Sequence, residues 1–128
     1  MEITIGLKGN YQYTVKDSDL ATNWGNDVPV LATPVLLWLA ELTCVKAIDH
    51  ISLERNALTV GYSHQMRHLS PAYLGDNVSF EATLTSVNGN KLVFNVKGYN
   101  GSEKVLEGIH ERYLINKEKY NQKYSYEK

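Results

Sequence analysis

Apolar and polar residues alternate near the start of the chain, in residues 3–7 and again in residues 11–15, on either side of Gly9-Asn10. Alternation with a period of two is typical of a strand with one buried face, and a Gly-Asn pair favours a turn. We therefore predict a strand, a turn and a second short strand. The polar, turn-rich residues 16–30 predict a loop with one short helical turn, long enough to act as a lid.

The pattern changes at Thr33, where the signals for a helix start coincide. Thr33 is suited to cap free backbone N–H groups, and Pro34 is favoured at the first helical position. The apolar residues that follow predict a helix to about His50. At 100° per residue, Thr43, Lys46 and His50 share one side, which we expect to face solvent.

After the helix the alternation returns, and the turn pairs Asn88-Gly89 and Asn100-Gly101 separate the later segments. The predicted strands are Ala57 to Leu69, Val78 to Val87, Lys91 to Tyr99, and Lys104 to Asn116. Neither an internal repeat nor a linker divides the 128 residues, so residues 1–128 are expected to form one α+β domain in which an antiparallel sheet wraps one helix. Residues 117–128 are expected to be a polar tail.

The amino-acid composition argues against several classes of function. The formal net charge is −1 and the body of the chain carries no polybasic block, which argues against a nucleic-acid partner. The longest apolar run, Val35 to Ala40, is far shorter than the roughly 20 residues that span a bilayer, so no membrane segment is expected. The first residues lack a signal-peptide pattern, and the single cysteine, Cys44, excludes an internal disulfide and predicts a reducing compartment, the cytoplasm.

Glu41 interrupts the most apolar part of the predicted helix. Its angular neighbours include Leu37, Cys44 and Ile48, so its carboxylate projects from the face expected to meet the sheet or a partner subunit. Desolvation would raise the pKa of such a group towards the range of a general base. The alternative is a structural Glu tied to a buried Arg or to backbone N–H groups.

Three other segments carry candidate chemistry with alternatives of their own. Thr33 is either an ordinary cap or part of a helix N-terminus that holds an oxyanion. His64 and His68 lie about 13 Å apart on a strand, too far to share a metal ion, and His68 is the better candidate because it precedes a turn. Arg112 either forms a cross-strand ion pair or holds a polar part of a ligand.

Three segments in order, ATPVLLWLAE, TVGYSHQMRHLSPAYLGDNV and GIHERYLI, resemble the hotdog-fold acyl-CoA thioesterases, and most closely the fluoroacetyl-CoA thioesterase type. The resemblance implies the hotdog fold, an antiparallel β-sheet around one long central helix, assembled as a homodimer or a tetramer with active sites between subunits. It implies Thr33, Glu41 and His68 as the catalytic set. Gly61 would lie near the thioester carbonyl and Arg112 near the acyl group.

The predicted function is hydrolysis of an acyl-CoA thioester to free acid and CoA. Glu41 would be the general base, Thr33 the nucleophile or a positioning hydroxyl, and His68 the group that transfers protons. No metal or cofactor is expected, because CoA enters as part of the substrate. The alternatives are a non-catalytic acyl-CoA binding module and, on fold-level analogy, an enoyl-thioester hydratase.

Overall fold

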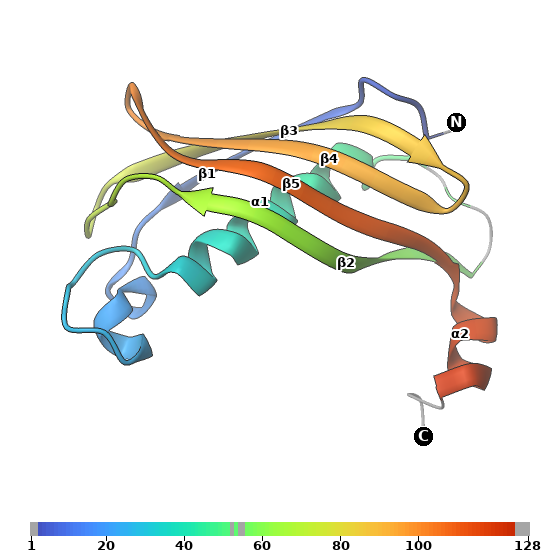
Figure 1. Cartoon of the computed structure of the whole chain (residues 1–128), viewed down its shortest axis with the longest axis horizontal. Helices are drawn as coiled ribbons and strands as arrows, with labels where there is room; N and C mark the ends of the chain where they lie inside the picture. The colour runs from blue at the N-terminus through green and yellow to red at the C-terminus, as the bar shows by residue number, and fades with distance from the viewer. Residues whose placement is uncertain (1–2, 52, 54–55, 125–128) are drawn as a thin grey trace.

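A five-stranded antiparallel sheet arches over one long helix in the computed structural model, which describes residues 3–51, 53 and 56–124 (Figure 1). The strand order is β1-β3-β4-β5-β2. The strands are β1 (Lys8–Thr14), β2 (Ala57–His68), β3 (Asn77–Asn88), β4 (Lys91–Asn100) and β5 (Glu103–Asn116). The helices are α1 (Thr33–Ile48) and α2 (Lys117–Tyr124), and two 3-10 turns, Asp17–Asp19 and Ala21–Trp24, lie between β1 and α1.

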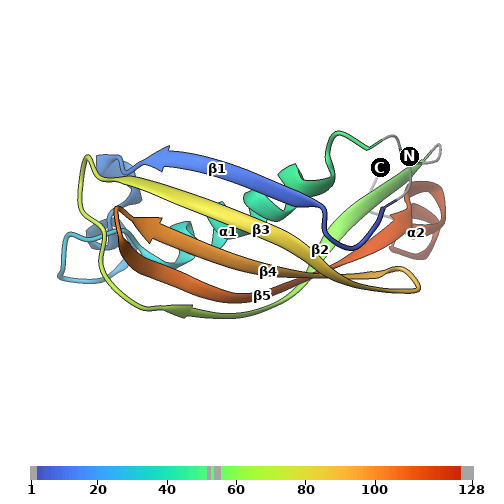
Figure 2. The same cartoon turned by 90° about the horizontal axis from the view of Figure 1, so that it is seen from above.

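The α+β arrangement expected from the sequence is confirmed. Helix α1 lies under the sheet and is seen behind the strands when the molecule is viewed from above (Figure 2). Its apolar residues join one core with the inward side chains of the strands, such as Phe80, Leu84 and Phe94. The tight turns after Asn88 and Asn100 lie where the sequence predicts them, and Gly89 and Gly101 take the positive φ that such turns favour.

The start of the chain differs from the prediction. Residues 3–7 form no strand, and Gly9-Asn10 lies inside β1 rather than at a turn. The reason is a close approach between β1 and α1, because a Cβ atom on Gly9 would overlap the backbone oxygen of Thr43 and lie 2.6 Å from the backbone nitrogen of Ala47. Glycine is needed here for packing, not for a turn.

The same contact corrects the predicted solvent face of the helix. Thr43 is fully buried under β1, and its hydroxyl donates to the carbonyl of Leu39, one helical turn earlier. Lys46 and His50 are exposed as expected. A helical-wheel argument places residues relative to one another, but only the position of β1 decides which side is covered.

The described part of the expected polar tail is helical. Residues 117–124 form α2, which projects beyond the end of β5 (Figure 1). The side-chain oxygen of Asn116 accepts a hydrogen bond from the backbone N–H of Lys119 at 3.0 Å, so Asn116 caps this helix. Residues 125–128 lie outside the described part of the chain.

Candidate active site

The Glu41 carboxylate is paired with a buried arginine. Arg112 Nη1 donates to Glu41 Oε2 at 2.8 Å, and the side chains of Glu41 and Arg112 are 34% and 8% exposed. Two further hydrogen bonds fix the guanidinium, from Nε to Thr59 Oγ1 and from Nη2 to the carbonyl of Thr59, both at 3.0 Å. Glu41 therefore forms the pair with a buried arginine that the sequence predicts as its structural role. This pair uses only one of the two carboxylate oxygens, Oε2.

Glu41 also lines a hollow at the open edge of the sheet, which we call the Glu41 hollow. It has a volume of about 310 Å³ and is lined by Glu41, Gly61, Tyr62, Ser63, His64 and His110. Gly61 permits the carboxylate to lie against the strand, because a Cβ atom there would be 2.5 Å from Glu41 Oε2. The carboxylate is thus both anchored and reachable from outside.

Two histidines of this hollow, His64 and His110, were not predicted as site residues. Their rings stack with centroids 4.4 Å apart, and both Nε2 atoms lie within 4 Å of a Glu41 oxygen. Burial, followed by the nearby His64 and Arg112, lowers the pKa of His110 to about 4, although Glu41 opposes the shift. His64 and His110 face each other across the β2–β5 ladder, a pairing that spacing along one strand does not reveal.

Thr33 and His68 form a second group. The Thr33 Oγ1 atom lies 2.7 Å from His68 Nδ1, which joins the first residue of α1 to the last residue of β2. Thr33 is not the helix cap that the sequence predicts, because Ala32 occupies the cap position and the Thr33 hydroxyl points to the imidazole. Burial lowers the pKa of His68, partly offset by a backbone hydrogen bond at Ser70, so the ring is neutral at pH 7 and able to accept the hydroxyl proton.

The two groups are separated within one chain. Thr33 and Glu41 are eight residues apart on α1, which corresponds to about 12 Å along the helix axis. The Thr33–His68 pair lies at the N-terminal end of the helix, whereas the Glu41 hollow lies near its middle. A single protomer therefore does not bring all three predicted catalytic residues into contact with one reacting centre.

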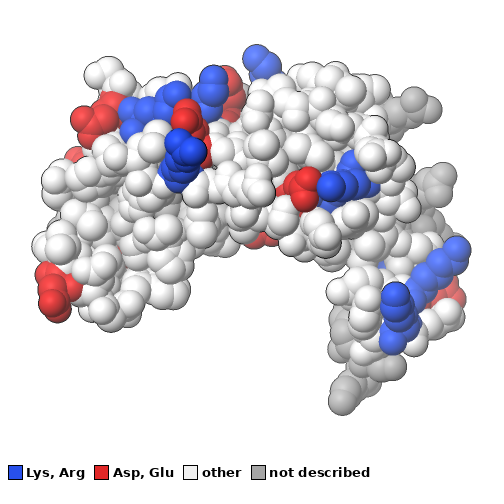
Figure 3. All heavy atoms as spheres, viewed as in Figure 1, with Lys and Arg blue, Asp and Glu red and all other residues white. Residues whose placement is uncertain are grey.

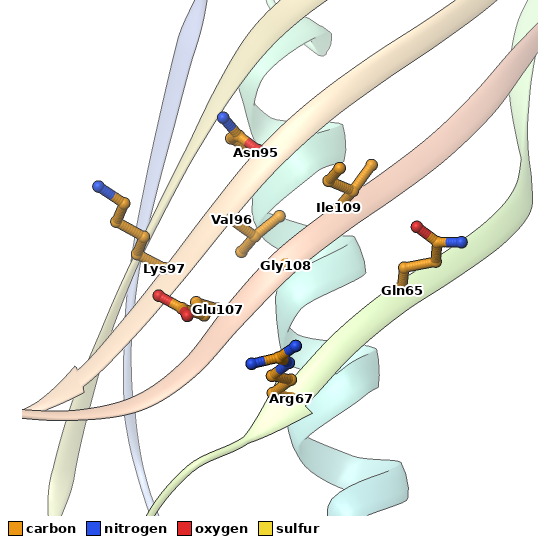
Figure 4. Close-up of a pocket in the computed structure, with 8 residues that line it drawn as sticks. All are labelled: Gln65, Arg67, Asn95, Val96, Lys97, Glu107, Gly108 and Ile109. Atoms are coloured by element: carbon orange, nitrogen blue, oxygen red, sulfur yellow. The ribbon is translucent and has the colours of Figure 1, made fainter.

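Two of the other depressions on the described surface are lined by residues of the sheet. One of about 250 Å³ is on the face of the sheet away from α1, where Arg67, Lys97 and Glu107 stand on neighbouring strands in lateral register (Figure 4). These are cross-strand charge pairs of an exposed sheet face. The other, of about 640 Å³, lies between the β2 edge and α2 and is lined by Tyr62, Lys119 and Lys123 among others; the lysines of α2 are the blue spheres at the lower right of Figure 3.

Neither described helix is long and apolar enough to cross a membrane. Within residues 3–51, 53 and 56–124, the His, Cys, Asp and Glu side chains form no group of three or more that could hold a metal ion. Cys44 is a free, buried thiol, and its pKa is raised to about 12, mainly by burial.

Comparison with known proteins matches residues 15–118 to the model of the fluoroacetyl-CoA-specific thioesterase family. A fluoroacetyl-CoA thioesterase from Streptantibioticus cattleyicolor is 33% identical over 94 residues, which cover 73% of this chain and 67% of that protein. A crystal structure of a mutant fluoroacetyl-CoA-specific thioesterase has a TM-score of 0.87 and 25% identity, with 98% and 97% of the two chains covered. A hot-dog-like protein from Thermanaerovibrio acidaminovorans has a TM-score of 0.86 and 26% identity, with 94% of this chain and 90% of that chain covered.

The fold and these similarities define a hotdog-fold enzyme of the thioester hydrolase class. The chain belongs to the fluoroacetyl-CoA-specific thioesterase family.

Proposed function

We propose that this protein hydrolyses an acyl-CoA thioester to the free acid and CoA, with Thr33, Glu41 and His68 as the catalytic residues. The observation that carries the proposal is the 2.7 Å contact between the Thr33 hydroxyl and a neutral His68 at the start of α1. A hydroxyl held by an imidazole base is the arrangement by which enzymes activate an oxygen nucleophile. It occurs here in a chain of a thioesterase family.

In this mechanism His68 takes the Thr33 proton as the hydroxyl oxygen approaches the thioester carbonyl. The same imidazole then protonates the leaving thiolate of CoA. The negative charge that develops on the carbonyl oxygen lies near the N-terminus of α1, where backbone N–H groups and the helix dipole stabilise an anion. If Thr33 positions the substrate instead of attacking it, the His68 role in protonating the thiolate is unchanged.

Glu41 is proposed as the base that activates water. When Thr33 is the nucleophile, the water oxygen attacks the acyl carbon of the Thr33 ester, the bond from that carbon to Oγ1 breaks, and the proton taken up by Glu41 returns to Oγ1 as the free acid leaves. Because Oε2 accepts the hydrogen bond from Arg112, Oε1 is the oxygen placed to take a proton from a water molecule in the hollow. Gly61 would let the thioester carbonyl approach the strand without a side chain between them. Arg112 would act near the acyl group, and since its guanidinium is buried, it would do so across the Glu41 carboxylate.

The complete site is proposed to form in a homodimer, alone or as half of a tetramer. Strand β2 is the last strand of the sheet, so its outer edge is open in the single chain. Trp38, on α1, is half exposed. A second copy that covers this edge and this face could bring its Thr33–His68 pair to the Glu41 hollow of the first copy, which removes the 12 Å separation within one chain.

CoA would enter as part of the substrate, and the proposal uses neither a resident cofactor nor a metal. The acyl group is left open between short, branched, aromatic and long chains. The proposed compartment is the cytoplasm, in keeping with the single free thiol of Cys44.

The test is a thiol-release assay with a panel of acyl-CoA esters, run on the wild type and on Glu41→Gln, with sedimentation to establish the oligomeric state. Wild-type turnover that falls 10²–10⁴-fold in the variant supports the proposal. Tight binding of CoA esters without thiol release would instead identify a binding module. Loss of enoyl absorbance without thiol release would identify a hydratase, and a monomer at micromolar concentration would contradict the shared site.

A further inference from the structure

The stacked pair of His64 and His110 lies directly beside Glu41, yet the proposed mechanism gives it no role. Hydrogen-bond donors and acceptors around the pair determine where each imidazole carries its proton. Arg112 fixes the first of these assignments, because a guanidinium has hydrogen-bond donors and no acceptor.

Arg112 can only donate, and its Nη1 atom lies 3.2 Å from His110 Nε2. His110 Nε2 must therefore be an unprotonated acceptor, so the ring proton is on Nδ1. This agrees with the position of Nδ1, which is 3.1 Å from the carbonyl oxygen of Ser63, an acceptor. Burial, which lowers the pKa of His110 to about 4, keeps this ring neutral at pH 7.

The proton on His110 then fixes His64. His110 Nδ1 lies 3.2 Å from His64 Nδ1 as well as 3.1 Å from the Ser63 carbonyl, so its one hydrogen is shared between these two acceptors, and a second hydrogen on His64 Nδ1 would clash with it. The donated hydrogen of His64 is therefore on Nε2. That atom is the one that faces Glu41 Oε1, at 3.8 Å.

We infer that His64 is a positioning residue of the reaction: it donates from Nε2 to Glu41 Oε1 and keeps the carboxylate aimed into the hollow. The inference rests on the proposed function, in which Glu41 is the general base. The present separation exceeds a hydrogen bond by less than 1 Å, and catalytic hydrogen bonds commonly tighten when substrate binds. Both side chains are about one-third exposed, which leaves them room to rotate together.

The charged and titratable groups around His64 agree with this role. Helix α1 contributes Glu41 and the neutral thiol of Cys44, whose pKa is raised to about 12, and β5 contributes His110 and Arg112. Glu41 thus receives one donor from each side, Arg112 at Oε2 and His64 at Oε1. His110 keeps His64 in the tautomer that donates.

The experiment compares His64→Leu, which removes the donor, with His64→Gln, whose amide N–H₂ can replace Nε2–H. The control is His50→Leu, an exposed histidine nine residues from Glu41 on the chain. For each protein kcat and KM are measured on the best acyl-CoA ester. In His64→Leu we expect kcat to fall about tenfold with KM within twofold, because the base is misplaced while substrate binding is kept. His64→Gln and His50→Leu should keep wild-type kcat and KM.

An unchanged kcat in His64→Leu overturns the inference, and so does an equal loss of kcat in His64→Gln, since an amide N–H₂ that replaces the donor should restore the position of the carboxylate. If Glu41→Gln is inactive while His64→Leu behaves as wild type, the inference alone fails. If Glu41→Gln is fully active, the proposed base fails first. Nitrogen-15 NMR of the wild type gives a readout independent of activity: protons on His64 Nε2 and His110 Nδ1 support the inference, and any other pair of tautomers contradicts it.

Discussion

Replacing Thr33 separates a chemical role from a structural one, because the structure removes the capping role that its sequence position suggests. Thr33 is exposed, occupies the first helical position and makes its side-chain hydrogen bond to His68. Thr33→Ala deletes that bond. Thr33→Ser keeps the hydroxyl at the same place and removes a methyl group.

The stability cost of Thr33→Ala can be bounded from these contacts. An exposed hydrogen bond contributes about 0.5–1.5 kcal/mol, and the higher helix propensity of alanine returns up to about 0.7 kcal/mol. The net change in unfolding free energy is therefore within about 1 kcal/mol, or a few degrees in Tm for a chain of this length. Such a protein remains folded at 25 °C.

The expected effect on catalysis is much larger. If the hydroxyl attacks the thioester or positions it, its loss should lower kcat by about 10²–10⁴-fold, which corresponds to roughly 3–5 kcal/mol of barrier. Melting temperature and thiol release are measured on the wild type and both variants. A Thr33→Ala protein that melts within a few degrees of wild type and retains near-normal kcat would refute the nucleophile and the positioning roles together. Glu41 would then have to activate water directly.

Three further predictions concern the Glu41 hollow. Glu41→Gln preserves shape and removes the base, so kcat should fall at least 10²-fold while the thermal melt shows a folded protein; wild-type turnover would leave Glu41 a structural partner of Arg112. Gly61→Ala should lower kcat about tenfold or more and also lower Tm, because the new Cβ displaces Glu41 Oε2, which lies 2.5 Å away and accepts the hydrogen bond from the buried Arg112; unchanged kinetics would exclude a requirement for close approach. The pKa of His110 is lowered to about 4 in the folded state, so between pH 6.5 and 4 the folded protein binds fewer protons than the unfolded chain. The stability that this group contributes above pH 6.5 should therefore be lost as the pH falls from 6.5 to 4, by up to about 3 kcal/mol. Urea unfolding at pH 7 and pH 5 measures this loss, which should shrink in His110→Asn; an identical loss in that variant would assign it to other groups.

The sequence predicts elements well where local signals decide them. Helix α1 and strands β2 to β5 begin and end within two residues of their predicted limits, because alternation, the Pro34 start and the two Asn-Gly turns are local signals. Gly9 and Thr43 were misjudged because their environment is set by each other across the interface of β1 and α1. Helix α2 had a readable signal, the Asn116 cap, in a segment whose polarity suggested a tail.

The site residues also divide into those that a local signal reveals and those that depend on contacts between elements. Glu41 was recognisable because one charge in an apolar run needs an explanation, whereas Arg112 was predicted to form a cross-strand ion pair or to hold a ligand, and its pairing with Glu41 came only from the structure. His64 and His110 were not recognisable, since their contact depends on the register between β2 and β5, which places them opposite each other although they are 46 residues apart. Thr33 and His68 were ambiguous as separate residues, and the resemblance to a family grouped them before the structure showed their contact.

The two explanations for Glu41, buried structural partner and catalytic base, are compatible because a carboxylate has two oxygens. An unpaired charge on the inner face of α1 would be costly, and the hydrogen bond from Arg112 to Oε2 offsets that cost. Thr59 holds the guanidinium in turn, so the anchor does not depend on substrate. Oε1 remains on the side of the hollow, opposite His64. A helix that must be apolar to pack under the sheet can therefore carry one carboxylate on its inner face, provided that one oxygen is held by Arg112 and the other faces the hollow.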